Sequence, residues 1–180
     1  MTTGVTSRAA IAQPPLAGFV GQVLSALGDA VVQVERCDRH RGMARIQPAR
    51  VAEVSRQLFA MPEARFQTIT GIDARDGIDM LYHWAFDAHG VVITLKALAA
   101  RPGLAIESVG AFIPAARWIE REIHDLLGAS FPGHPDMRRL ILDDSWPEGV
   151  YPLRKDFDQI KDRPPLPPVP PDPSAQGRED

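Results

Sequence analysis

Carboxylate and imidazole side chains cluster in the C-terminal third of this 180-residue chain, and they are the groups best suited to chemistry. Glu120 and His124 are four residues apart, and His134 and Asp136 follow. Side chains of these kinds bind zinc or transfer protons in enzymes. Neither H-E-x-x-H nor H-x-E occurs, and helical spacing predicts that Glu120 and His124 lie on the outer face of a helix. A small free-standing metal-dependent enzyme using Glu120, His124 and His134 is therefore an alternative and not the main prediction.

Other catalytic and cofactor-binding motifs are absent from the sequence. There is no glycine-rich phosphate loop and no G-x-S-x-G nucleophile motif. The one cysteine, Cys37, excludes an intrachain disulfide and a Cys-ligated zinc or iron–sulfur site built from this chain alone. A net charge of −3 provides no basic field for nucleic acid, so we expect no nucleic-acid partner.

Helical and strand periodicities alternate between residues 16 and 127, and they predict the elements that position these side chains. Apolar alternation is clearest where Met80, Tyr82, Trp84 and Phe86 share one face. The order of elements predicts an α+β domain at 16–127 with two layers, in which helices cover one face of a mostly antiparallel sheet. We expect helices at 16–27, 48–61 and 115–127, a hairpin of strands 30–36 and 43–47, a meander of strands 66–73, 78–86 and 91–98, and a loop that can contain a short strand at 106–109.

Composition divides the rest of the chain into three parts. Residues 1–15 predict a disordered arm, residues 128–160 an extended ribbon without periodicity, and residues 161–180 a proline-rich flexible tail. The tail leaves open an adaptor protein whose proline-rich segment is bound by another domain. A signal peptide is missing, as is an apolar run of the roughly 20 residues needed to cross a bilayer. We therefore expect a soluble protein that reaches a membrane only through its partners.

The predicted helix 115–127 carries charged side chains beside its apolar stripe. These neighbours include Trp118, Arg121, Glu122 and Asp125, of which Arg121 and Asp125 have the spacing of an ion pair. A solvated flank is the simpler interpretation, and a partner-facing patch is the functional one, because Trp and Arg often anchor interfaces. The ribbon that follows cannot form a core of its own, so it must lie either on this domain or on a partner.

Several short motifs follow one another through this region in a fixed order. They are Glu120-Arg121-Glu122, Asp125-Leu126, Gly128, Phe131, Gly133-His134-Pro135-Asp136, Arg138-Arg139-Leu140 and Pro152-Leu153-Arg154-Lys155-Asp156-Phe157. Together they resemble the signature of the 30 kDa subunit family of respiratory complex I (NADH-quinone oxidoreductase), which includes a homologous module of membrane-bound energy-converting NiFe hydrogenases and formate hydrogenlyases. The segment 143–151 departs from the complex I pattern and is more similar to the hydrogenase-associated branch.

The resemblance implies a non-catalytic docking subunit in the peripheral arm of a membrane-bound multisubunit oxidoreductase. Such a chain has no cofactor of its own, and iron–sulfur clusters, with flavin or nickel, are expected in partner subunits. It would pack on a large quinone-site or NiFe-type subunit near small iron–sulfur subunits, at the cytoplasmic, inner face of the cell membrane. The residues that we expect at partner interfaces are Trp118, Glu120, Arg121, Glu122, Asp125, His134, Asp136, Arg138, Arg139, Trp146, Leu153, Arg154, Lys155 and Asp156.

Overall fold

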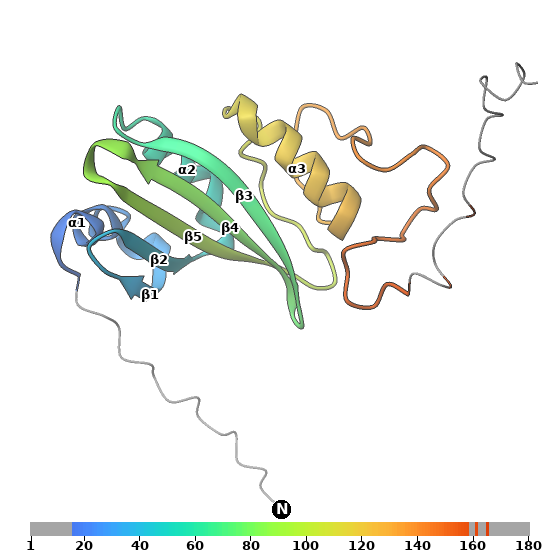
Figure 1. Cartoon of the computed structure of the whole chain (residues 1–180), viewed down its shortest axis with the longest axis horizontal. Coiled ribbons are helices and arrows are strands. Elements are labelled where there is room, and N and C mark those ends of the chain that lie inside the picture. The colour runs from blue at the N-terminus through green and yellow to red at the C-terminus, as the bar shows by residue number, and fades with distance from the viewer. Residues whose placement is uncertain (1–15, 159–160, 162–164, 166–180) are drawn as a thin grey trace, which may run out of the picture.

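The computed structural model describes residues 16–158 together with Lys161 and Pro165 (Figure 1). The predicted N-terminal arm at 1–15 lies outside the described residues, as does the predicted tail at 161–180 apart from Lys161 and Pro165. In the described part of the chain, no helix is both long enough and apolar enough to cross a membrane.

Helices and strands follow one another in the order that the sequence predicts. They are α1 (Gly18–Ala26), β1 (Val31–Cys37), β2 (Arg41–Ile46), α2 (Val51–Phe59), β3 (Arg65–Ala74), β4 (Gly77–Phe86), β5 (Val91–Ala100) and α3 (Pro114–Leu127), with short 3-10 turns at Gly28–Ala30, Pro48–Arg50 and Asp87–His89. The segment 106–109 forms no regular strand, because pairing in this region is limited to an isolated bridge between Ala105 and Ser130.

The five strands form one mixed sheet in the order β1-β2-β5-β4-β3. The predicted hairpin β1–β2 and the predicted meander β3–β4–β5 are both antiparallel, and a parallel pairing of β2 with β5 joins them. The prediction of an α+β fold with a mostly antiparallel sheet is confirmed. In this strand order β5 and β4 lie inside the sheet, and β3 lies at one edge, beside α3 (Figure 1).

Two close approaches show which face of the sheet the helices cover. A Cβ atom at Gly42 in β2 would lie 2.7 Å from Val20 of α1, and a Cβ atom at Gly71 in β3 would lie 2.7 Å from Leu127 of α3. Gly71 pairs with Met80 of β4, so its missing side chain would point to the same face as that buried methionine. The two glycines therefore let α1 and α3 pack closely on one face.

The aromatic row of β4 forms the centre of the core on that face. Tyr82, Trp84 and Phe86 are at most 1% exposed, which confirms the predicted alternation. Helix α2 contributes Val54 and Leu58 to the same cluster of buried side chains. The core thus lies between the sheet and its three helices, as expected for a two-layer α+β domain.

The other face of the sheet carries a group of interacting polar side chains. His83 of β4 lies between two hydroxyl groups, with Nε2 3.1 Å from Oγ1 of Thr70 and Nδ1 3.0 Å from Oγ1 of Thr94. Lys96 and Asp79 form an ion pair of 2.8 Å on this side. Partial burial lowers the pKa of His83, which favours the neutral ring.

Replacing Gly71 by Val should destabilise the domain, because the new side chain would push Leu127 and Ile123 of α3 away from β3. Overpacking of this kind costs about 1–3 kcal/mol in the free energy of unfolding. Gly103→Val is the control, because a Cβ at Gly103 meets no atom within 4 Å. Urea denaturation of both variants checks the difference, and equal stabilities would contradict the described packing of α3 on β3.

Candidate functional site

The ribbon, defined here as residues 128–158, lies against helix α3 of its own chain. One carboxylate oxygen of Asp125 accepts the backbone N–H groups of Leu140 and Ile141 at 2.7 and 2.8 Å, and that of Leu142 at 3.4 Å. Burial of Asp125 opposes its ionisation, but these N–H groups outweigh it and hold the pKa of the carboxyl below its ordinary value. A charged carboxylate therefore fixes three successive amides of a segment that has no regular structure.

Arg121, one helical turn before Asp125, holds the same part of the ribbon through carbonyl groups. Its Nε donates to the carbonyl oxygen of Arg138 at 2.7 Å, and its Nη2 donates to that of Arg139 at 2.9 Å. The guanidinium also lies over the ring of Trp118, 5.5 Å from the ring centroid. The predicted ion pair between Arg121 and Asp125 does not form, because each side chain binds ribbon backbone instead.

The end of the ribbon caps the C-terminus of α3. Gly128 adopts φ 73° and donates its N–H to the carbonyl of His124 at 2.8 Å, which ends the helix as the sequence predicts. The N–H of Leu153 donates to the carbonyl of Leu126 at 3.1 Å, and Nε of Arg154 donates to that of Leu127 at 2.7 Å. These bonds satisfy helix carbonyls that have no partner within the helix, and they place a cation where the helix dipole favours one.

A second carboxylate ties the ribbon to the sheet. Asp73, at the end of β3, is 8% exposed and accepts the backbone N–H of Lys155 at 2.9 Å. Its other oxygen accepts Nη2 of Arg101 at 2.7 Å, which pairs the buried charge. The ribbon is therefore attached at its middle, to α3, and near its end, to α3 and β3.

The prediction that Glu120 lies on an outer face of the helix is wrong, since the residue is fully buried. Its carboxylate accepts three hydrogen bonds, from the hydroxyl of Ser108 at 2.5 Å, from the N–H of Val109 at 2.7 Å and from the N–H of Gly110 at 3.2 Å. The loop that precedes α3 folds over this side of the helix. Burial raises the pKa of Glu120, and the three hydrogen bonds offset that effect only in part. Because the side chain of Glu120 has no exposed surface, it makes no direct contact with a partner protein.

The two histidines of the alternative metal-site hypothesis serve as structural linkers. His134 accepts the N–H of Asp136 at Nδ1 (3.0 Å), and its Nε2 lies 3.1 Å from the carbonyl of Arg117 and 3.8 Å from Glu120. A neutral ring protonated at Nε2 satisfies both hydrogen bonds. His124 donates from Nδ1 to the carbonyl of Ala129 at 2.7 Å. Among the described residues, no three His, Cys, Asp or Glu side chains come together to hold a metal ion.

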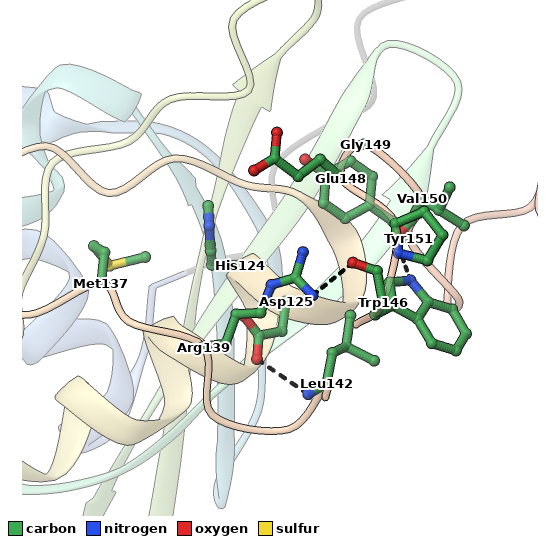
Figure 2. Close-up of a pocket in the computed structure, with 11 residues that line it drawn as sticks. His124, Asp125, Met137, Arg139, Leu142, Trp146, Glu148, Gly149, Val150 and Tyr151 are labelled. Carbon is green, nitrogen blue, oxygen red and sulfur yellow. Dashed lines mark hydrogen bonds between the residues drawn. The ribbon is translucent and has the colours of Figure 1, made fainter. Parts of the chain in front are cut away.

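A cavity of about 410 Å³ lies between the last turns of α3 and the loop 137–151 (Figure 2). Arg139, whose charge could attract an anion, donates from Nη1 to the carbonyls of Asp143 and Trp146, both at 2.7 Å. The indole Nε1 of Trp146 in turn donates to the carbonyl of Val150 at 2.9 Å. These polar groups hold the loop in shape, and the arrangement supports a folded ribbon better than a reaction centre.

The remaining predicted interface residues are on the surface. Trp118 and Leu153 are 62% and 60% exposed, and Glu122, Lys155 and Asp156 are also exposed. A further exposed group is the ion pair of Arg138 with Asp136, at 2.7 Å. The structure thus separates the predicted interface residues into those that bind the ribbon or loops of this chain and those that remain available to other proteins.

Comparison with known proteins matches residues 44–163 to the family described as respiratory-chain NADH dehydrogenase, 30 Kd subunit. The chain is 39% identical over 98 residues to a subunit of the F(420)H(2) dehydrogenase of Methanosarcina mazei, covering 53% of this chain and 61% of that protein. It is 47% identical over 72 residues to hydrogenase-4 component G of Escherichia coli, covering 40% of this chain and 13% of that protein. The chain thus matches less than two thirds of the length of either relative.

The fold is also similar to that of a solved structure. A chain in the membrane-bound sulfane sulfur reductase, an archaeal respiratory membrane complex, superposes with a TM-score of 0.65. The alignment covers 78% of this chain and 84% of that chain at 24% sequence identity, so the likeness concerns the fold alone.

Gly128→Ala should destabilise the chain more than Gly133→Ala. Both glycines have positive φ, 73° and 85°, so a Cβ strains each backbone by about 1–2 kcal/mol. A Cβ at Gly128 would also collide with the Tyr151 ring and lie 2.6 Å from Arg154, whereas a Cβ at Gly133 meets no atom within 4 Å. Chemical denaturation measures the difference, and equal losses would show that the ribbon does not pack on the end of α3.

Glu120→Gln should flatten the pH dependence of stability above pH 4. Because the pKa of Glu120 is raised on folding, the folded chain retains this proton above the ordinary Glu pKa of about 4.3. Its contribution is therefore complete below that pH and is lost as the pH rises through the folded pKa. The free energy of unfolding measured between pH 4 and 8 should fall less in the variant. An unchanged slope would mean that Glu120 ionises as freely in the folded chain as in the unfolded one.

Proposed function

The chain belongs to the family of the 30 kDa subunit of respiratory-chain NADH dehydrogenase, and from this membership we propose that it is a structural docking subunit in the peripheral arm of a membrane-bound multisubunit oxidoreductase. The observation that carries the proposal is the use of charged side chains at α3. Asp125 and Arg121 bind backbone groups of the ribbon, and Arg154 of the ribbon binds the carbonyl of Leu127 in α3, so together they hold an irregular segment in one shape. Shaping a surface is the task of a docking subunit.

The names of the relatives support a role that does not depend on the electron donor. The family is that of an NADH dehydrogenase subunit, and the two relatives belong to an F(420)H(2) dehydrogenase and a hydrogenase. A module shared by complexes with different donors does not itself select the donor. We accordingly propose that iron–sulfur clusters, and flavin or nickel, are held by the partner subunits and not by this chain.

The proposed contact with partners uses the outer side of α3 and the exposed side of the ribbon. Trp118, Glu122 and Leu153 lie there, as does the Asp136–Arg138 ion pair. The proposed neighbours are a large quinone-site or NiFe-type subunit and small iron–sulfur subunits. In this arrangement the chain lies at the inner face of the cell membrane and is held there by the complex.

Asp125→Ala should lower recovery of the complex, because it releases the ribbon from α3. Loss of hydrogen bonds to a charged group costs about 1.5–3 kcal/mol, which is enough to disorder a segment without its own core. Asp76→Ala, which removes an exposed carboxylate in the turn between β3 and β4 and not on the proposed contact, is the control. Both variants are purified through a tag from detergent-solubilised membranes, and the recovery of partner subunits is quantified.

The proposal predicts that the control retains full recovery and that the isolated wild-type chain contains no stoichiometric iron, nickel or flavin. Stoichiometric metal or flavin in the isolated chain would contradict a docking role without chemistry. Full recovery with Asp125→Ala would show that the shape of the ribbon does not matter for assembly.

A further inference from the structure

A second depression, distinct from the cavity of Figure 2, lies between α3 and β3. We call it the α3–β3 groove. It has a volume of about 270 Å³, and its lining includes Thr68 of β3, Ile119, Glu122 and Leu126 of α3, and Leu153 of the ribbon. Pockets for small molecules are usually about 300–1,000 Å³, so this space is better suited to a few side chains.

Exposed apolar side chains lie beside the groove. Trp118, Glu122 and Leu126 follow one another at four-residue intervals, so they lie along one side of α3. Trp118 and Leu153 have the largest exposed fractions, 62% and 60%, among the large hydrophobic residues of the described chain. Exposed apolar side chains that adjoin a groove are typical of a contact surface.

The outer edge of β3 forms the opposite wall. β3 is the last strand of the sheet and, in the part of the chain that the structure describes, pairs only with β4. Alternate N–H and C=O groups along an edge strand point away from its neighbour and can bind another strand. Natural edges are usually protected by charged side chains, proline or bulges. In β3 the charged residues, Arg65 and Asp73, lie near the two ends and the pairing irregularity lies at Phe66–Thr68, so residues 69–72 carry none of these protections.

One charge in the groove has no counterpart. Glu122 is exposed, and no hydrogen bond or ion pair involves its side chain among the described residues. The nearest arginine in sequence, Arg121, donates to ribbon carbonyls instead. A groove that combines apolar side chains with this carboxylate complements a segment that combines apolar side chains with a lysine or arginine.

We propose that an extended segment of a neighbouring subunit occupies the α3–β3 groove as an additional strand on β3. Its apolar side chains, at alternate positions, contact Ile119, Leu126 and Leu153, and its lysine or arginine pairs with Glu122. This inference rests on the proposed function, because the occupant belongs to another subunit of the complex. The tail of this chain is a poor occupant, because prolines, which dominate 164–173, have no N–H to donate to an edge strand.

Photo-cross-linking in the purified complex identifies the occupant. A photoreactive phenylalanine derivative replaces Thr68, which lines the groove, or in the control Val32, which is 55% exposed on β1 at the other edge of the sheet. The proposal predicts that the probe at residue 68 reacts with one partner peptide that has alternating apolar residues and a basic residue, and that the probe at residue 32 does not react with that peptide. Cross-links to residues 159–180, to a second copy of this chain or to nothing would overturn it.

Charge exchange tests the role of Glu122 separately. Glu122→Gln should weaken retention of the cross-linked subunit about 2- to 5-fold, as expected for a partly exposed ion pair, and Glu122→Lys should weaken it further. Asp29→Lys, at an exposed carboxylate in the turn before β1 at the other edge of the sheet, is the control and should have no effect. When the basic residue of the partner is also replaced by glutamate, the Glu122→Lys variant should again retain the cross-linked subunit. No loss with Glu122→Lys would overturn the assigned pairing.

The two proposals fail in different ways. If the wild-type chain co-purifies with no membrane oxidoreductase, the proposed function is wrong. If it co-purifies with such a complex but the probe at residue 68 does not react with a partner strand, the function stands and only the groove assignment is wrong.

Discussion

The carboxylate of Asp125 is the interaction on which the shape of the ribbon depends. An irregular segment has no ladder to satisfy its backbone, so its N–H and C=O groups need other partners wherever they are buried. Asp125 supplies the acceptor for residues 140–142, and Arg121 supplies the donor for the two preceding carbonyls. Arg154 then secures the far end on the last turn of α3. Helix α3 thus acts as the template for a segment that cannot fold alone.

Two carboxylates on α3 fix the segments on either side of it, and their pKa values shift in opposite directions. Asp125 holds the ribbon after the helix, and its pKa is lowered because three amides stabilise the charge despite burial. Glu120 holds 108–110 before the helix, and its pKa is raised because deeper burial outweighs its hydrogen bonds. Acidic side chains that resemble a catalytic cluster in the sequence are therefore used to position backbone. Trp118, Glu122 and Leu153 remain on the surface, where a partner can reach them.

The sequence predicts the elements well because their signals are local. Alternation along 78–86 gives the buried row of β4, and Gly128 marks the end of α3. The parallel pairing of β2 with β5 has no such signal, because it depends on contacts between distant segments. A signal for the burial of Glu120 was present, since it lies four residues after Ala116 and three before Ile123, both buried. Because a charged residue is usually expected at the surface, this helical spacing alone does not predict that Glu120 is buried. The hydrogen bonds from the amides of 140–142 to Asp125 could not be predicted, because no periodic pattern in the sequence indicates which side chain an irregular segment will contact.

Hydrogen exchange of the amides of Leu140, Ile141 and Leu142 in the isolated chain tests the central claim most directly. If α3 shapes the ribbon before any partner binds, these amides are protected at neutral pH in the wild-type chain, and Asp125→Ala removes that protection while the amides of β4 remain protected. Exchange of residues 140–142 at the rate of an unfolded peptide in the wild-type chain would contradict the account, because it would show that the ribbon takes its shape from the partner and not from α3.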